Sequence, residues 1–168
     1  LAPYVNYRPD SNSAEQWQSL NQSTIWSVFH LHRNGVLNPE AAGPFSQTLK
    51  LLQGAGVMQL AGYAPNAMFS VLDAGGYIQP HFGSVNGRLI VHLPLEIPEN
   101  CGYLEVAGER RPWVVGEPII FDDSLRHSAK NESSKRRIVL IFDIWHKNLS
   151  AVERMALGAI LQSMAQAI

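Results

Sequence analysis

Residues 77–95 read Tyr-Ile-Gln-Pro-His-Phe-Gly-Ser-Val-Asn-Gly-Arg-Leu-Ile-Val-His-Leu-Pro-Leu, and this stretch decides the fold class. It holds two short runs of β-strand composition, and the turn-forming pair Asn86-Gly87 separates them. In the second run the side chains alternate between two faces, so Arg88, Ile90 and His92 share one of them. Polar side chains beside an apolar one suit either a strand that lines a cavity or a solvent-exposed strand, and this run alone leaves both open.

The same pattern of short strands and turns extends over residues 57–143. No helical pattern interrupts it, which is typical of a β-sandwich or a barrel. The final run is apolar on both faces from Ile138 to Phe142, so we expect it to be buried on both sides. Together with an earlier run at 25–31, the predicted strands are 66–72, 77–82, 88–95, 102–107, 111–115, 118–122 and 135–143.

Helices are predicted on both sides of this core. Pro44 and Gly54 bracket an amphipathic run and predict a helix over 45–53. Further on, Ser150-Ala-Val-Glu153 is a capping box, which predicts a helix over 150–168. We expect the apolar stripe of this helix to dock on the barrel, with a partner interface as the alternative; the stripe comprises Val152, Met155, Ala159, Ile160 and Met164.

The composition fits one globular domain. The chain has 168 residues, of which 46% are hydrophobic and 16% charged, and this length can bury a sizeable core. We expect a single domain (1–168) with a polar arm and helical lead-in over 1–56, a β core over 57–146 and the helix over 150–168. The formal net charge of −1 gives no electrostatic basis for binding nucleic acid.

Cysteine content and hydropathy bear on the compartment. Cys101 is the one cysteine, which excludes an internal disulfide and fits a reducing compartment. No apolar run approaches the roughly 20 residues that a membrane-spanning helix needs, and no signal peptide opens the sequence. We therefore expect a cytoplasmic protein without a transmembrane segment. The sequence begins with Leu1 rather than methionine, so it can be a trimmed piece of a longer protein.

Two histidines in separate strand-like runs are the candidate metal ligands. His81 follows Pro80 and precedes Phe82-Gly83, and His127 ends a second polar motif that starts at Phe121. Two imidazoles with open positions beside them suit Fe(II) and oxygen chemistry, whereas a structural zinc site usually has four ligands, often cysteines. The alternative for either residue is an ordinary core or surface histidine. We interpret the pair as the holders of one Fe(II).

Arg137 is the candidate anion-binding residue. It stands at the start of the apolar run 138–142, and a buried arginine needs an anionic partner. With a turn near 131–134, we expect His127 and Arg137 to lie roughly opposite each other on adjacent strands. An arginine fork can bind a carboxylate through two hydrogen bonds. That carboxylate can belong to an acid cosubstrate or to an Asp or Glu of the chain itself.

Taken together, these motifs resemble the aspartyl/asparaginyl β-hydroxylase family. The resemblance covers most of the chain, from about Trp26 to the C-terminal helix, and rests on residues 70–95, 121–127 and 137–146. It implies a mainly β fold, a double-stranded β-helix (jelly roll, cupin-like) with flanking N-terminal helices and a C-terminal helix. It also implies an Fe(II)- and 2-oxoglutarate-dependent dioxygenase. Such an enzyme uses O2 to hydroxylate a β-carbon of an aspartyl or asparaginyl residue or a related amino acid, and releases succinate and CO2.

The resemblance assigns roles residue by residue. His81 and His127 match the two iron ligands at the catalytic centre. Ser70 and Arg137 match positions that hold the distal carboxylate of 2-oxoglutarate. The other matches are His92, which contacts the cosubstrate, Trp26, which lines the same pocket, Arg88, which can serve the cosubstrate, and Asp123, which stands where a substrate-contacting aspartate would be.

Three positions qualify this assignment. Gly83 matches the family in lacking an acidic third ligand, and water can fill that place. Ile90 and Met68 stand where a family member has arginine and lysine, so we expect different contacts to carboxylates of the cosubstrate or substrate. Two alternative functions remain open. One is a halogenase with a halide beside Gly83, and the other is a cupin-like metal- and 2-oxoglutarate-binding protein without catalysis. The substrate itself is expected to be a peptide or an amino acid.

Overall fold

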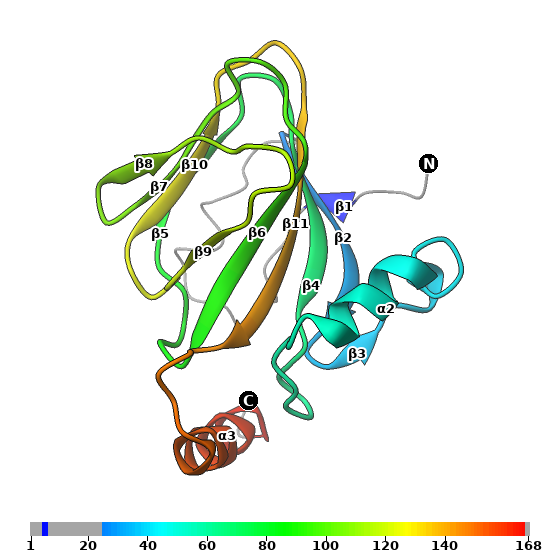
Figure 1. The fold of residues 1–168 in the computed structure, drawn as a ribbon, viewed down its shortest axis with the longest axis vertical. Coiled ribbons are helices and arrows are strands. Elements are labelled where there is room, and N and C mark those ends of the chain that lie inside the picture. Colours follow the sequence, from blue (N-terminus) through cyan, green and yellow to red (C-terminus); the bar gives the residue numbers. More distant parts are fainter. Residues whose placement is uncertain (1–4, 7–24, 167–168) are drawn as a thin grey trace.

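The computed structural model describes the backbone of residues 5–6 and 25–166 and the side chains of residues 25–163. Two antiparallel sheets face each other (Figure 1), one with the strand order β1-β2-β4-β11-β6-β9 and β3 beside β2, the other with the order β5-β10-β7-β8. The strands are β1 (Val5–Asn6), β2 (Trp26–Arg33), β3 (Val36–Leu37), β4 (Ala67–Leu72), β5 (Tyr77–His81), β6 (Arg88–Glu96), β7 (Gly102–Val106), β8 (Glu109–Arg111), β9 (Ile119–Phe121), β10 (His127–Asn131) and β11 (Arg137–Trp145). The helices are η1 (Pro39–Ala41), α2 (Ser46–Gly54) and α3 (Ala151–Gln166).

The topology is that of a double-stranded β-helix. From β4 onward the chain crosses repeatedly between the sheets, so that β4, β6, β9 and β11 lie in the larger sheet and β5, β7, β8 and β10 in the smaller one. Each sheet thereby receives four strands of a jelly roll, which buries its apolar strand faces between two layers. The predicted mainly β, jelly-roll fold with flanking helices is confirmed.

One predicted strand is wrong. Residues 111–115 were expected as a strand, but β8 ends at Arg111, and the chain then forms a loop with an isolated bridge between Val114 and Glu117. The loop turns the ring of Trp113 inward, where its side chain is 4% exposed. The apolar residues of this segment therefore reflect one buried anchor rather than strand alternation.

The predicted pairing of His127 with Arg137 is also wrong. His127 begins β10, which pairs with β5 and β7, whereas Arg137 begins β11, which lies between β4 and β6. The turn between them carries the chain from one sheet to the other. The buried side chain of Asn131 fixes that turn, because its amide nitrogen donates hydrogen bonds to the backbone oxygens of Leu72, Asp73 and Lys135 at 2.8–3.0 Å.

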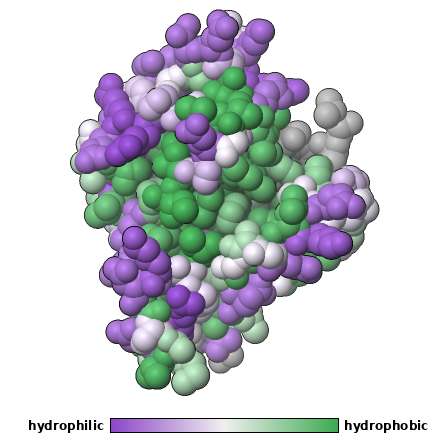
Figure 2. All heavy atoms as spheres, viewed as in Figure 1, coloured by the Kyte–Doolittle hydropathy of each residue, from purple (hydrophilic) through white to green (hydrophobic). Residues whose placement is uncertain are grey.

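Separate apolar clusters form on the two faces of the larger sheet. The space between the sheets holds Leu72, Leu104, Trp113 and Val139 together with other apolar side chains. The outer face packs against the segment that carries α2, through side chains that include Phe45, Leu49 and Leu52. Figure 2 shows apolar residues gathered over the middle of one broad face of the molecule. The inner space matters most for function, because the candidate site residues point into it.

Helix α3 docks with a different stripe from the expected one. Its capping box is confirmed, since the hydroxyl of Ser150 and the carboxylate of Glu153 form the reciprocal hydrogen bonds of this motif. The helix lies at one end of the sandwich (Figure 1) and packs Leu157 and Leu161 against a small cluster around Met58. The expected docking stripe is therefore wrong, because the side chains of Val152, Met155, Ala159 and Ile160 are exposed to solvent, while that of Met164 lies outside the described residues.

Two further expectations concern the N-terminal arm and membrane-spanning helices. The predicted polar arm lies outside the described residues except for β1, which pairs with β2. In the part of the chain that the structure describes, no helix is both long enough and apolar enough to cross a membrane.

Candidate functional site

The two candidate metal ligands lie side by side on the smaller sheet. His81 ends β5, His127 begins β10, and the two are paired directly in the strand register. Their ring centroids are 4.1 Å apart, with the ring planes tilted by 55°. The tertiary fold thus brings together two imidazoles from separate parts of the chain.

Hydrogen bonds to the backbone orient both rings. The Nδ1 atom of His81 lies 2.7 Å from the carbonyl oxygen of Gln79, and that of His127 lies 2.8 Å from the carbonyl oxygen of Leu125. A carbonyl oxygen can only accept, so Nδ1 carries the proton in each neutral ring and Nε2 carries the lone pair. Backbone partners of this kind commonly fix the tautomer of metal-binding histidines.

The environment keeps these imidazoles neutral. Burial, together with the smaller effect of the neighbouring His127, lowers the pKa of His81 to about 4. Burial also lowers the pKa of His127, and it lowers the pKa of His92 well below its usual value. Only a neutral imidazole can ligate a metal, so the pair is suited to this task at neutral pH.

We expect acid to destabilise the metal-free fold through His81. Between pH 6.5, its ordinary pKa, and about 4, its pKa in the folded protein, the unfolded chain binds a proton that the folded chain does not. Stability contributed by this histidine is therefore present above pH 6.5 and lost as the pH falls, by up to about 3 kcal/mol. Urea unfolding of EDTA-treated protein across this range measures the loss. The variant His81→Asn should show a shallower decline, and an identical decline in both proteins would contradict this assignment.

Arg137 lies across the inner space on the larger sheet and is fully buried. Its Nη1 donates hydrogen bonds to the backbone oxygen of Ser70 at 3.0 Å and to the Ser70 hydroxyl at 3.1 Å. The indole nitrogen of Trp26 also donates to that hydroxyl at 3.0 Å, which fixes its orientation. The guanidinium stacks over the ring of Trp113 at 4.8 Å. These contacts hold the arginine in place from one side.

The other side of the guanidinium is unsatisfied. Its Nε and Nη2 atoms are buried and have no hydrogen-bond partner among the described residues, and no Asp or Glu of that part forms an ion pair with it. Burial, partly offset by Cys101, lowers the pKa of Arg137 to about 10, so it remains charged at neutral pH. A buried, charged fork with two unused donors is suited to bind an anion. The alternative of a salt bridge within the described chain is not found.

His92 lies near both the histidine pair and this arginine. It is buried on the inner face of β6, its ring contacts Phe121 at a centroid distance of 5.2 Å, and Phe121 in turn contacts His127. Burial is the main cause of its lowered pKa, and Arg137, His127 and His81 add to that lowering. Its Nδ1 has no partner among the described residues, so a bound ligand could meet it.

Arg88 and Asp123 form an ion pair instead of facing the inner space separately. Nη2 of Arg88 lies 2.8 Å from the Asp123 carboxylate, and Nη1 lies 3.5 Å from that of Asp143. Asp143 is buried and also accepts two hydrogen bonds from Asn66, at 3.0 Å each. Both terminal nitrogens of Arg88 are thus directed to carboxylates of the chain.

Asp123 also explains the glycine at position 83. The amide of Gly83 donates a hydrogen bond to the backbone oxygen of Asp123 at 2.6 Å. A Cβ atom built on Gly83 would overlap the carboxylate of Asp123. The space where a third, acidic ligand would project is therefore occupied by a carboxylate from another part of the chain. In the described residues, no group of three or more His, Cys, Asp or Glu side chains is arranged to hold a metal.

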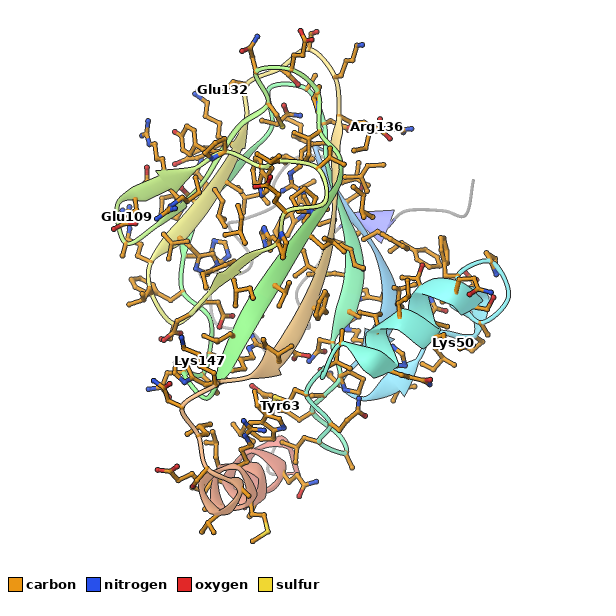
Figure 3. The ribbon with its side chains drawn as sticks, viewed as in Figure 1. Lys50, Tyr63, Glu109, Glu132, Arg136 and Lys147 are labelled. Carbon is orange, nitrogen blue, oxygen red and sulfur yellow. The ribbon has the colours of Figure 1, made fainter. Side chains whose placement is uncertain are left out.

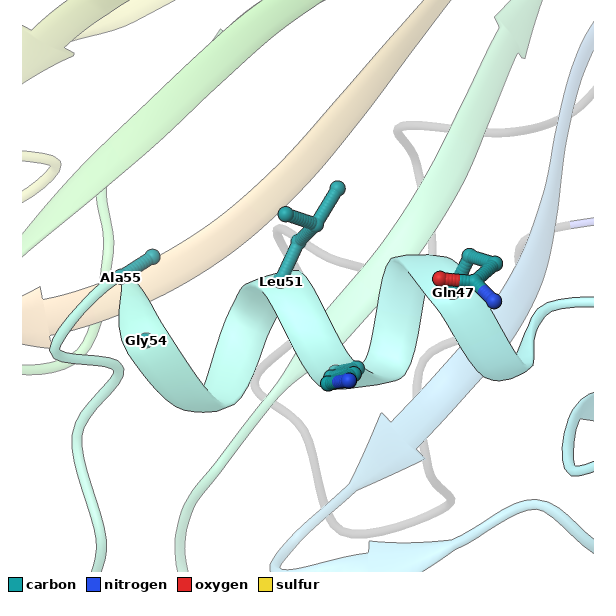
Figure 4. A pocket seen from close by; sticks show the side chains of 5 residues that line it. Gln47, Leu51, Gly54 and Ala55 are labelled. Carbon is teal, nitrogen blue, oxygen red and sulfur yellow. The ribbon is translucent and has the colours of Figure 1, made fainter.

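The structure collects the sequence-predicted residues around one inner space. Figure 3 shows the side chains that fill the gap between the two sheets. Sequence reasoning missed Trp113 and Asp143, which hold Arg137 and Arg88 in position. A signal for Asp143 was available, since a charged residue inside an otherwise apolar strand needs a partner. A depression elsewhere, on the exposed side of α2, contains none of the predicted residues (Figure 4); it is lined by Gln47, Lys50, Leu51, Gly54 and Ala55.

Comparison with known sequences identifies one family. The profile of the aspartyl/asparaginyl β-hydroxylase family matches residues 3–147. Aspartate β-hydroxylase domain-containing protein 2 of Xenopus tropicalis is 38% identical over 138 residues, covering 80% of this chain and 37% of the relative. The human protein of that name is 37% identical over 160 residues, covering 92% and 43%. Human aspartyl/asparaginyl β-hydroxylase is 32% identical over 144 residues, covering 85% and 19%. The chain thus spans less than half the length of each of these relatives.

Solved structures with similar folds include cupin domains. The cupin domain of Schizosaccharomyces pombe Cnp3 is 11% identical, with a TM-score of 0.49 and coverage of 84% of this chain and 77% of that one. A cupin 2 conserved barrel domain protein from Salinispora arenicola is 12% identical, with a TM-score of 0.46 and coverage of 95% and 99%. Identities this low say nothing of function.

Proposed function

This chain belongs to the aspartyl/asparaginyl β-hydroxylase family, and we propose on that basis that it is an Fe(II)- and 2-oxoglutarate-dependent dioxygenase. In the proposed reaction, O2, 2-oxoglutarate and a substrate C–H bond give succinate, CO2 and a hydroxylated β-carbon. One oxygen atom enters succinate and the other enters the product. The substrate would be an amino-acid residue or a related amino acid.

The observation that carries this proposal is the unsatisfied guanidinium of Arg137. A buried charge with two unused donors is costly unless a ligand pairs with it, so the ligand-free site is prepared for an anion. The Ser70 hydroxyl lies beside it, and Trp26 fixes that hydroxyl. A carboxylate at the far end of a dicarboxylic acid fits this arrangement, and the neutral histidine pair lies across the same inner space.

The residues present fit an iron site of weak protein ligation. His81 and His127 would hold Fe(II) through Nε2, since Nδ1 of each ring is committed to a backbone carbonyl. Bound iron and 2-oxoglutarate would supply the oxidant from O2. His92 would contact the cosubstrate between the metal and Arg137. We assign Arg88 to holding Asp123, because both of its terminal nitrogens already face carboxylates.

We expect the affinity for Fe(II) to depend strongly on 2-oxoglutarate. Two histidines are few ligands for Fe(II), so chelation by the cosubstrate should add most of the missing binding energy. Anaerobic calorimetry with Fe(II), with and without 2-oxoglutarate, should show affinity at least about tenfold higher in its presence. Succinate release in air, with iron and ascorbate supplied, then tests turnover. Equal iron affinities would contradict the proposed site, and tight binding of both ligands without succinate would favour a binding protein that lacks catalysis.

The halogenase alternative needs space for a halide beside Gly83. The carboxylate of Asp123 occupies that space, and its negative charge would repel a halide. Nothing in the described part of the chain favours this alternative over hydroxylation. Product mass spectrometry in chloride buffer would reveal halogenation directly.

A further inference from the structure

Three half-buried apolar side chains lie on the inner face of the larger sheet, level with His92 or beyond it in the direction away from Arg137. They are Met68, Ile90 and Ile141, here called the aliphatic patch, and each packs against the inner cluster. Ile141 pairs with Met68 on one neighbouring strand and with His92 on the other. Ile90 pairs with Asp143, the next inward residue along β11. The patch therefore forms a continuous, partly accessible surface next to the proposed cosubstrate site.

The described strands that carry the aliphatic patch, β4, β6 and β11, offer no uncommitted Lys or Arg to an acidic ligand. Arg137 is assigned to the cosubstrate, and Arg88 is held between the carboxylates of Asp123 and Asp143. Beyond these two arginines, no Lys or Arg lies on the inner face of β4, β6 or β11. Near this patch the formal charges are thus two carboxylates against one guanidinium. A further carboxylate would be desolvated next to an existing negative charge and without a Lys or Arg partner from these strands, which is unfavourable.

We propose that this site selects substrates whose reacting side chain is uncharged and aliphatic, and that it rejects aspartyl side chains. The inference rests on the proposed function, since it concerns the substrate of that same reaction. Met68 and Ile90 are the specificity-determining residues, because their side chains would contact the substrate group that approaches the metal. An aliphatic group would gain from burial against them, whereas a carboxylate would lose its hydration without compensation.

The test compares two side chains of similar shape, one aliphatic and the other negatively charged. The probes are the capped tripeptides acetyl-Gly-Leu-Gly-amide and acetyl-Gly-Asp-Gly-amide. Their affinities are measured by anaerobic calorimetry on protein loaded with Mn(II) and 2-oxoglutarate, which does not turn over, and succinate release with Fe(II) in air is recorded in parallel. We expect the Leu peptide to bind at least about tenfold more tightly than the Asp peptide and to stimulate succinate release more strongly.

A charge placed in the patch should reverse this preference. Met68→Lys keeps the length of the side chain and adds a cation, so the Asp peptide should gain at least about tenfold in affinity while the Leu peptide loses. Met68→Gln controls for polarity without charge. Ile120→Lys is the matched charge control, because Ile120 lies on β9, which pairs with β6, and is exposed to solvent. This variant should leave both affinities unchanged.

Each outcome bears on a different claim. Binding of 2-oxoglutarate is measured first without peptide, and its absence would overturn the proposed function together with this inference. If 2-oxoglutarate binds but the Asp peptide binds as well as the Leu peptide, only the substrate class is overturned. Failure of the Leu peptide to bind the loaded protein would overturn the substrate class in the same way.

Discussion

Replacing Arg137 by methionine is expected to weaken the binding of 2-oxoglutarate by about 100-fold or more without lowering the stability of the ligand-free protein. The guanidinium is fully buried, and two of its nitrogens have no partner among the described residues. A buried charge pair broken from one side commonly costs 2–5 kcal/mol of binding, roughly 30-fold to more than 1000-fold. In the ligand-free protein, by contrast, the variant removes a buried charge that is only partly satisfied.

Two measurements separate this result from misfolding. Thermal unfolding should give a melting temperature for Arg137→Met equal to or above that of the parent protein, while calorimetry with Mn(II) and 2-oxoglutarate shows the loss of binding. Arg136→Met is the matched control, since Arg136 is the preceding residue and lies at the outside of the molecule (Figure 3). It should change neither quantity. A large drop in melting temperature for Arg137→Met would instead indicate that the arginine is a structural residue.

Any side chain at position 83 is expected to disrupt the proposed metal site. A Cβ on Gly83 would overlap the Asp123 carboxylate, which Arg88 holds at 2.8 Å from the other side. Gly83→Ala should therefore displace Asp123 and destabilise the fold by about 1–3 kcal/mol, the usual cost of overpacking. Gly83→Asp adds charge repulsion to the overlap, so it should bind Fe(II) no better than the parent protein even though it supplies an acidic side chain.

Two further variants serve as controls for the steric overlap and for the charge repulsion. Gly43→Ala should be nearly neutral in urea unfolding, because a Cβ there meets nothing within 4 Å. The double variant Gly83→Asp with Asp123→Gly removes the overlap and restores one carboxylate near the histidine pair. We expect it to regain stability relative to Gly83→Asp. If Gly83→Asp alone were as stable as the parent and bound Fe(II) more tightly, the carboxylate of Asp123 would not occupy the ligand position.

Local sequence patterns predicted much of the β structure. Strands β4 to β7 and β11 were found within one or two residues of their observed bounds, since alternation and turn residues act locally. Helix α2 was likewise predicted by Pro44, Gly54 and the apolar spacing between them. The segment at 111–115 was mistaken for a strand, because a single buried anchor, Trp113, and its apolar neighbours imitate a short strand.

Pairing between distant segments was harder to predict. The expectation that His127 and Arg137 share a hairpin failed because chain proximity suggested pairing, whereas the doubly buried strand β11 requires two neighbours of its own. The prediction of which face of α3 packs on the core failed for a related reason. Two apolar stripes run along that helix, and only contact with the cluster around Met58 selects the one that contains Leu157 and Leu161.

For the candidate site, the sequence by itself determined which residue types are available: two histidines in strand-like runs, an arginine at the start of an apolar strand, and a glycine two residues after the first histidine. Only the tertiary structure decided how they are used. It placed the histidines in register, left two nitrogens of Arg137 without a partner among the described residues, engaged Arg88 with Asp123 and Asp143, and put the Asp123 carboxylate against Gly83. The physical reason is that hydrogen bonding, desolvation and steric exclusion depend on which groups meet in space, and those groups come from strands far apart in the chain.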